Sequence, residues 1–276
     1  MEQEKLDKFK AWFDNYVAGF YGDDDFVNFH LKLKQEHTLR VCREMQFLAN
    51  ELGLAENQKR IAEVIALLHD IGRFRQFIKY RTYSDVKTVN HCLMGLEILG
   101  ENKVLEGIEE KERGWIEKAI EYHGLKYLPA DLNGQCLLFS KLIRDADKLD
   151  IFYVAIEYYR HYKGKKEKYL LELETLDEPW YSHDLVEALL HGKNIDYAQL
   201  RTLNDWKLMQ LGWVYDVNFP PTLKRIKQQK FLETLLSFLP QTEDIQKVEE
   251  KILGYVDSRC AETMKERNYH GNSFAD

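Results

Sequence analysis

The sequence predicts an all-α protein, and three observations lead to this prediction. The 276 residues include only 5 prolines, so long stretches lack the residue that breaks helices. Apolar residues recur at the three- and four-residue spacing of a buried helix face. No alternation of apolar and polar residues is long enough to indicate a strand. With 45% hydrophobic residues, the chain can bury a sizeable core.

The first helix is expected over residues 4–20. Leu6, Phe9 and Phe13 share one face at helical spacing, so this helix should pack on the protein core. A turn should follow at Gly22–Asp25. Its three adjacent aspartates lack the ligand spacing and the central glycine of a calcium-binding loop.

Five further helices are expected to form the core, and glycine follows the apolar pattern at their ends, which is the usual stop signal. Their expected ranges are 33–52, 57–70, 86–100, 110–123 and 135–163. Later helices are expected at 183–192, 196–212, 222–239 and 243–266. We therefore divide the chain into an N-terminal helix that packs on the core (1–29), a core domain (30–164) and a helical extension (165–276).

The charge and the cysteines limit the class of protein. The net charge is −7, whereas a protein that binds nucleic acid usually carries a basic face. No run of about 18 apolar residues, the length that spans a membrane, is present. Cys42, Cys92, Cys136 and Cys260 include no C-x-x-C pair, so reduced thiols are the simplest account. We expect a cytoplasmic protein with neither a membrane nor a nucleic acid as its partner.

Histidines and aspartates occur on the apolar faces of the expected core helices, where their side chains would point inward. These residues are His37, His69, Asp70, His123 and Asp147. A single buried histidine is more often hydrogen-bonded to a backbone carbonyl than bound to a metal. An ionised aspartate, however, is tolerated in an apolar interior only when it is paired or metal-bound. One cation centre shared by these residues and His91 explains all six positions.

The order of these residues resembles the motifs of the HD superfamily, which is named for its His-Asp doublet. His37, the doublet His69-Asp70 and Asp147 follow one another as in that family. The segment Arg144–Asp150, RDADKLD, looks like the final motif of the family, in which an aspartate in an ADxLD context is the last ligand. The resemblance covers residues 30–160 and implies an HD-domain helical bundle with a C-terminal helical extension.

Two further histidines, His91 and His123, fall where binuclear members of the family place additional ligands. The pattern H…HD…H…H…D is similar to that of HD-type dinucleoside-polyphosphate hydrolases and, in part, to that of cyclic-di-GMP phosphodiesterases. The second group carries another histidine where this chain has Gly124, and favours lysine where this chain has Arg73. Both departures argue against the second group.

The resemblance implies two divalent transition metal ions, with Fe, Mn, Co, Ni and Zn all compatible with imidazole and carboxylate ligands. The first ion would be bound by His37, His69, Asp70 and Asp147, and the second by His91, His123 and the other oxygen of Asp70. Asp145 and Asp150 are read as residues of the helix surface or as supports behind the ligands. A hydroxide bridging the two metals would attack phosphorus.

The implied activity is that of a metal-dependent phosphohydrolase. Its substrate would be a phosphate ester or anhydride of a nucleotide or of another small phosphorylated metabolite. Asp70 would be catalytic through the metals, and Arg73 and Lys148 through contact with phosphate, because each lies beside an expected ligand.

The segment 73–88 is basic and follows the doublet directly. It holds five lysines and arginines against Asp85, with aromatic residues between them. We expect a loop that recruits the phosphate of the substrate. Its expected substrate-binding residues are Arg73, Arg75, Lys79 and Arg81. The alternative is a solvated connector whose aromatic residues pack on the core.

Two other functions stay open. A mixed-valent di-iron oxygenase of the same superfamily would use a similar set of ligands, although the basic segment favours phosphate. A nucleotide-sensing module would keep the fold without turnover, although such a module need not retain six inward-facing polar residues. The remaining histidines, including His30, do not extend the motif and are read as surface or packing residues.

Overall fold

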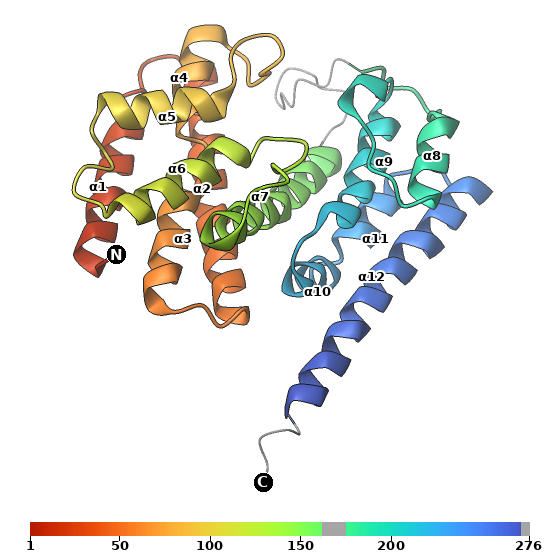
Figure 1. The fold of residues 1–276 in the computed structure, drawn as a ribbon. Coiled ribbons are helices and arrows are strands. Elements are labelled where there is room, and N and C mark those ends of the chain that lie inside the picture. The colour runs from red at the N-terminus through yellow and green to blue at the C-terminus, as the bar shows by residue number, and fades with distance from the viewer. Residues whose placement is uncertain (162–174, 272–276) are drawn as a thin grey trace. The chain divides into compact units, whose positions relative to one another are not determined.

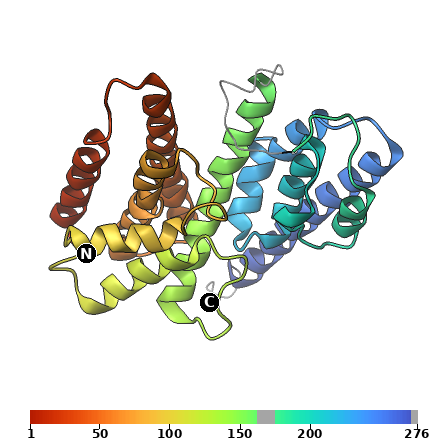
Figure 2. The ribbon, with the colours of Figure 1, turned by 90° about the horizontal axis from the view of Figure 1, so that it is seen from above.

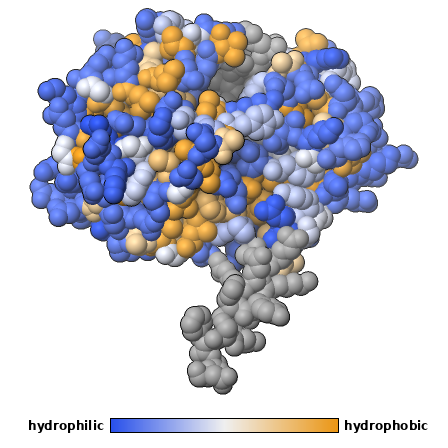
Figure 3. All heavy atoms as spheres, in the orientation of Figure 1, coloured by the Kyte–Doolittle hydropathy of each residue, from blue (hydrophilic) through white to orange (hydrophobic). Residues whose placement is uncertain are grey.

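The prediction of an all-α protein is confirmed. The structure, a computed structural model, describes residues 1–161 and 175–271, with side chains up to residue 261 in the last helix. These residues form α-helices and short 3-10 helices, and their only strand-like pairing is an isolated bridge between Leu176 and Thr202. None of the described helices has both the length and the hydropathy of a membrane span. The face drawn in Figure 3 is largely hydrophilic, with apolar side chains in smaller patches.

The chain divides into two compact units, Met1–Asp150 and Ile151–Asp276. Helix α7 begins in the first unit and ends in the second (Figure 1). The division at residue 164 stays a prediction, because residue 164 and the expected helix end at 163 lie outside the described residues.

The first unit is a helical bundle. Its helices are α1 (Gln3–Ala18), α2 (Asp25–Glu51), α3 (Glu56–Leu68), α4 (Ile71–Tyr80), α5 (His91–Glu101), α6 (Glu110–Tyr122) and the first part of α7 (Gly134–His161). Helix α2 packs along α3 and α4, α1 packs against α3, and α5 packs against α4 and α6 (Figures 1 and 2). The largest fully buried side chains include Phe13, Leu31, Met45, Ile65 and Phe74. The apolar stripes read from the sequence therefore form the core of this bundle.

The His-Asp doublet separates helix α3 from helix α4. His69 ends α3, and Asp70, with φ −104° and ψ 16°, precedes the first residue of α4. Gly72 then allows α4 to approach α5, because a Cβ at this position would overlap the carbonyl oxygen of His91. The break and this close approach bring the doublet next to the start of α5.

The prediction of a basic loop over residues 73–88 is wrong for the first half of this segment, which belongs to the helix α4. Ile71, Phe74 and Phe77 are buried at a spacing of three residues, and the lysines and arginines between them obscured this stripe in the sequence. The helix ends at Arg81, which has a left-handed φ of 58°. The helix expected over 86–100 begins only at His91, because the Asn90 side chain accepts a hydrogen bond from Leu93 N and caps it.

The second unit is also helical. It contains the rest of α7, α8 (His183–Leu190), η1 (Tyr197–Gln199), α9 (Leu203–Gly212), η2 (Trp213–Asp216), α10 (Pro220–Gln228), α11 (Phe231–Ser237) and α12 (Glu243–Gly271). Helix α12 packs against α8 and α10, and α11 packs against α9. Leu185, Leu208, Leu223 and Leu235 are fully buried between them.

Two expected helices of this unit are interrupted. The helix expected over 222–239 consists of α10 and α11, because Lys230 between them adopts a left-handed φ of 54°. The helix expected over 196–212 consists of η1 and α9, because the Thr202 hydroxyl accepts a hydrogen bond from Asp205 N and begins a new helix there.

Candidate metal centre

Five parts of the first unit contribute the six candidate ligands. They are His37 from α2, His69 and Asp70 from the break between α3 and α4, His91 from the start of α5, His123 from the end of α6, and Asp147 from α7. Five of these residues are buried, and the side chain of Asp147 is 19% exposed. The structure therefore brings all six together, although they are separated by up to 110 positions in the sequence.

The two carboxylate oxygens of Asp70 face two different pairs of histidines. Oδ2 lies 3.4 Å from His37 Nε2 and 3.7 Å from His69 Nε2. Oδ1 lies 3.4 Å from His91 Nε2 and 3.7 Å from His123 Nε2. Asp70 can therefore bridge two cation positions, one beside each pair.

In the first pair, hydrogen bonds behind the rings fix which nitrogen faces inward. His37 Nδ1 lies 2.7 Å from Asp150 Oδ2, and His69 Nδ1 donates to the Ala66 carbonyl at 2.7 Å. Burial lowers the pKa of His69 to about 4, so its imidazole is neutral near pH 7. Nε2 of His69 is therefore a free acceptor, as a metal ligand must be.

The second pair follows the same rule. His91 Nδ1 lies 2.5 Å from Asp85 Oδ2, and His123 Nδ1 donates to the Ile120 carbonyl at 2.7 Å. The two Nε2 atoms lie 3.1 Å apart. In both pairs, a carboxylate or a carbonyl orients each ring from behind, which is the usual arrangement around a histidine-bound metal.

Unsatisfied buried atoms show that a cation fits this centre. Nε2 of His37, Nε2 of His69 and Oδ1 of Asp147 are buried and have no hydrogen-bond partner. Asp147 Oδ1 lies 3.2 Å from His37 Nε2 and 3.8 Å from His69 Nε2. Leaving buried polar atoms unpaired is costly, and one divalent cation between them would satisfy all three. Imidazole and carboxylate donors suit a transition metal ion.

The electrostatics of the centre favour positive charge. Burial opposes the ionisation of Asp70, but the Lys34 ammonium and the imidazoles around it hold the pKa of its carboxyl well below the usual range. Burial and Lys34 oppose the protonation of His37, yet its contacts with Asp147, Asp150 and Asp70 raise its pKa to about 10. The carboxylates therefore stay charged and attract a proton or a metal ion to the same place.

Three supporting residues were missed or left undecided by the sequence. Lys34 Nζ lies 2.8 Å from Asp70 Oδ2, and its place one turn before His37 could have revealed it. In the sequence, Asp85 was counted only as the negative charge of the basic segment 73–88, because nothing local predicts its contact with His91. Asp150 is 3% exposed, and its carboxylate binds Arg40 Nε at 2.5 Å. Of the two roles expected for Asp150, the structure therefore agrees with a support behind the ligands and not with a residue of the helix surface. Asp145 is also fully buried.

Of the four expected substrate-binding residues, the structure places only Arg73 at the centre. Arg73 Nε lies 3.6 Å from Asp70 Oδ1, and its guanidinium also binds Asp85 at 2.7 Å. The other three have their closest charged or aromatic contacts elsewhere, namely Arg75 with Glu101, Lys79 with the Tyr80 ring and Arg81 with Asp24. Lys148 is half-buried on α7 beside Asp147.

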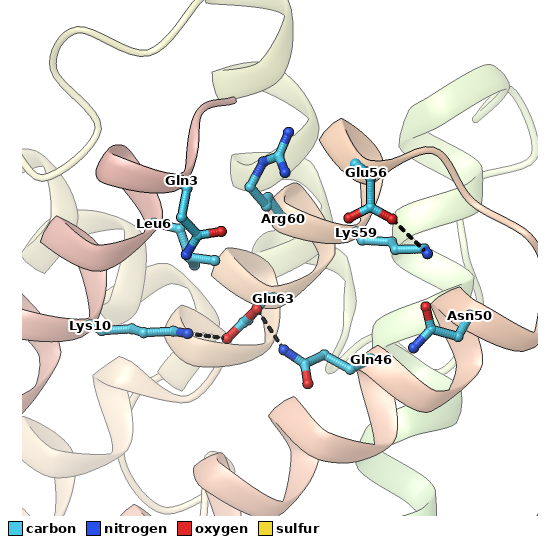
Figure 4. Close-up of a pocket in the computed structure, with 9 residues that line it drawn as sticks. All are labelled: Gln3, Leu6, Lys10, Gln46, Asn50, Glu56, Lys59, Arg60 and Glu63. Carbon is cyan, nitrogen blue, oxygen red and sulfur yellow. Dashed lines mark hydrogen bonds and ion pairs between the residues drawn. The ribbon is translucent and has the colours of Figure 1, made fainter.

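A separate polar hollow lies between α1, α2 and α3 (Figure 4), and none of the six candidate ligands lines it. Glu63 at its floor binds Lys10 Nζ at 2.6 Å and accepts a hydrogen bond from Gln46 at 2.6 Å. Lys59 at its rim binds Glu56 at 2.8 Å. These charges neutralise one another, so this hollow is not a comparable cation site.

The comparisons agree with the position of the centre. The family model of the HD domain matches residues 35–151, a range that contains all six candidate ligands. No curated protein and no solved structure matches the chain.

Proposed function

Because residues 35–151 form an HD domain, the domain of a metal-dependent hydrolase superfamily, we propose that this protein is a metal-dependent phosphohydrolase. Its substrate is a phosphate ester or anhydride of a nucleotide or of another small phosphorylated metabolite. The single observation that carries the proposal is Asp70, whose two oxygens face two pairs of histidine Nε2 atoms.

The residues present can hold two divalent cations. The first position is formed by His37, His69, Asp70 Oδ2 and Asp147, and the second by His91, His123 and Asp70 Oδ1. Bound there, such ions supply Lewis acidity, lower the pKa of water and neutralise charge on phosphoryl oxygens. The burial of the ligands strengthens these interactions, because the surroundings screen charge less than bulk water does.

The chain supplies two cationic groups beside Asp70. Lys34 and Arg73 approach its two oxygens from α2 and α4, at 2.8 and 3.6 Å. Ammonium and guanidinium groups are the usual partners of phosphate. A cation at Asp70 would compete with Lys34 for the same oxygen and leave its ammonium available to a substrate phosphate. Arg73 is held in place by Asp85, so it is oriented before the substrate arrives.

The proposal is tested on the full-length protein after its metals are removed and then restored with Mn²⁺, Fe²⁺, Co²⁺ or Zn²⁺. We expect about two ions per chain by elemental analysis, and phosphate release from at least one member of a panel of nucleotides and sugar phosphates. Metal loading without phosphate release, accompanied by oxygen consumption, would instead support an oxygenase.

A matched pair of variants tests the phosphate-binding part of the proposal. Arg73→Ala should lower the turnover of a phosphate ester while leaving the metal content intact. Arg75→Ala removes an arginine from the same helix that binds Glu101 on the surface, and should behave like the unmodified protein. Loss of metal from Arg73→Ala would mean that Arg73 supports the ligands and does not bind substrate.

A further inference from the structure

Gln76 is a buried amide that joins helix α4 to the loop before α5. Its side chain is fully buried, and both of its polar atoms have partners. Oε1 accepts a hydrogen bond from Arg73 Nη1 at 2.8 Å. Nε2 lies within hydrogen-bonding distance of Asp85 Oδ1, Thr88 Oγ1 and the Val89 carbonyl, at 3.0, 2.8 and 3.1 Å. One side chain of a helix therefore holds three points of the loop.

The partners of Gln76 fix which end of its amide faces the loop. A guanidinium group only donates hydrogen bonds, so the amide oxygen faces Arg73. A carboxylate and a backbone carbonyl only accept them, so the amide nitrogen faces Asp85 and Val89. The Thr88 hydroxyl can also accept from this nitrogen, because its own proton is donated to a backbone carbonyl of the loop. An amide supplies the acceptor and the donor that this position requires.

Asp85 connects this amide to the metal centre. Its Oδ1 faces Gln76, and its Oδ2 lies 2.5 Å from His91 Nδ1. Nε2 of the same imidazole faces Asp70 Oδ1 at 3.4 Å. The side chain of Asp85 is 31% exposed, so water competes with His91 for its carboxylate. An anchor inside the protein keeps the carboxylate behind the imidazole, where it orients the ring.

Arg73 also binds Asp85, but it is a different kind of anchor. Its Nη1 lies 2.7 Å from Asp85 Oδ1, and the proposed function assigns its charge to the substrate phosphate. A phosphate that attracts Arg73 would weaken its hold on Asp85. The neutral amide of Gln76 is not attracted in this way, so it can hold Asp85 both with and without a substrate.

We infer that Gln76 is a positioning residue for the second cation position, because it holds Asp85 behind His91 and so keeps His91 Nε2 directed at the ion. This inference rests on the two-cation centre of the proposed function. Gln76 acts through Asp85 and is not itself a ligand.

Gln76→Glu tests this inference on the metal-free, full-length protein. The change keeps the size of the side chain and the oxygen that faces Arg73, but it replaces the nitrogen that lies 3.0 Å from Asp85 Oδ1 by a carboxylate oxygen. Because the two charges repel each other, Asp85 should move away from His91. Titration calorimetry with Zn²⁺ should resolve two binding steps, and His91→Ala, which removes a ligand, identifies the step of the second position. Gln76→Glu should weaken that step about 10-fold and leave the other step nearly unchanged.

Gln46→Glu is the matched control. Gln46 Nε2 donates to Glu63 Oε2 at 2.6 Å in the polar hollow between α1, α2 and α3. The same change therefore makes two carboxylates face each other away from the metal centre, and both binding steps should stay as in the unmodified protein. If Gln46→Glu weakened the second step as much as Gln76→Glu does, the effect would be a general destabilisation and the inference would be overturned.

A double variant shows whether Gln76 acts through Asp85. Asp85→Asn alone should weaken the second step, because it removes the charge behind His91. Adding Gln76→Glu to Asp85→Asn should weaken this step no further, because the charge that would repel the new carboxylate is gone. Losses that simply add in the double variant would mean that Gln76 supports the fold in general, and would overturn the inference.

Gln76→Met removes the amide without burying a charge, so the test does not depend on the folding of Gln76→Glu. The second step should again weaken while the helical signal in circular dichroism stays, and an unchanged second step would overturn the inference. If two ions bind and the variants behave as expected but no phosphate is released from any substrate, the proposed function fails and the inference stands. The absence of any bound Zn²⁺ would overturn both.

Discussion

Both units of this protein bury an aspartate, but the two carboxylates have different partners. Asp205 in the second unit is fully buried. It accepts hydrogen bonds from Ser182 N at 2.8 Å, Ser182 Oγ at 2.9 Å, Arg201 N at 2.9 Å and Thr202 N at 3.2 Å. Backbone and hydroxyl donors of nearby loops therefore satisfy both of its oxygens.

Asp70 in the first unit is buried to a similar extent, with 4% of its surface exposed. Lys34 binds one of its oxygens, and the four surrounding Nε2 atoms lie 3.4 to 3.7 Å away. Two of these nitrogens, on His37 and His69, have no hydrogen-bond partner.

The comparison shows how a structural buried acid differs from a metal ligand. The structural acid is surrounded by N–H and O–H donors that leave nothing unsatisfied. Asp70 has one close donor, the Lys34 ammonium, and is otherwise surrounded by four imidazoles whose Nδ1 atoms have partners elsewhere, so that their Nε2 atoms face it. A metal ion between these nitrogens and the carboxylate oxygens would be bound by both.

The largest effect is expected from Asp70→Ala. The change removes the only carboxylate that both cation positions share, so metal binding and turnover should be lost together while the helical content stays. Elemental analysis and phosphate release measure the first two, and circular dichroism measures the third. A variant that keeps its metals and normal rates would refute the assignment of Asp70.

Asp205→Ala should have the opposite profile. The change leaves the buried N–H donors of Ser182 and Thr202 and the part-buried N–H of Arg201 unpaired, so the free energy of unfolding should fall by about 3 kcal/mol. Urea denaturation measures this loss. The metal content of the folded protein should not change, and a loss of metal without a loss of stability would contradict the comparison.

The sequence predicted the helices well where apolar side chains recur on one face. The stripe of Leu6, Phe9 and Phe13 was expected to be buried and is buried in α1. The breaks were harder to predict, because they depend on single residues. Lys230 interrupts the expected helix 222–239 because it adopts a left-handed φ. A lysine in the sequence does not indicate that its backbone will adopt this conformation.

The candidate site shows the same limit. His37 and Asp147 could be selected because each is a polar residue on an apolar stripe. The structure places His37 Nε2 3.2 Å from Asp147 Oδ1. Their role as ligands stays a prediction. Asp85 could not be selected, because its contact with His91 depends on the path of the loop between α4 and α5. Arg75 was selected for its charge alone, and the structure pairs it with Glu101.

A smaller effect is expected from Asp85→Asn, which tests whether the groups behind the imidazoles matter. The amide keeps the size of the side chain and one acceptor for His91 Nδ1, but removes the charge that makes the ring a better ligand. The affinity of the second cation position should fall about 10–100-fold, as measured by competition with a chelator. Asp131→Asn, which changes an exposed aspartate of the same unit, should leave the affinity unchanged.

The smallest effect, confined to acidic pH, is expected at His30, a buried histidine of the first unit outside the centre. Its ring stacks on Phe77 with centroids 4.3 Å apart and also contacts Phe26 and Tyr83. Its Nδ1 has no hydrogen-bond partner, like Nε2 of His37 and Nε2 of His69 at the metal centre. Aromatic rings, however, and not carboxylates, surround the His30 ring. Burial lowers the pKa of His30 to about 4, so the folded protein keeps this imidazole neutral.

The sign of the pH effect follows from that shift. The unfolded chain protonates a histidine below about pH 6.5, whereas folded His30 resists protonation down to about pH 4. Its contribution to stability is therefore complete above pH 6.5 and is lost as the pH falls from 6.5 towards 4. His30→Phe fills the same aromatic site without a titrating group, so it should avoid a loss of about 1 to 2 kcal/mol between pH 7 and pH 5. Urea denaturation at both pH values measures the difference, with the exposed His191→Gln as the control. The prediction would be contradicted if the free energy of unfolding fell equally in His30→Phe and in the unmodified protein between pH 7 and pH 5. His30 would then be protonated in the folded protein, and a ring nitrogen without a hydrogen-bond partner would not be enough to identify a neutral histidine in this unit.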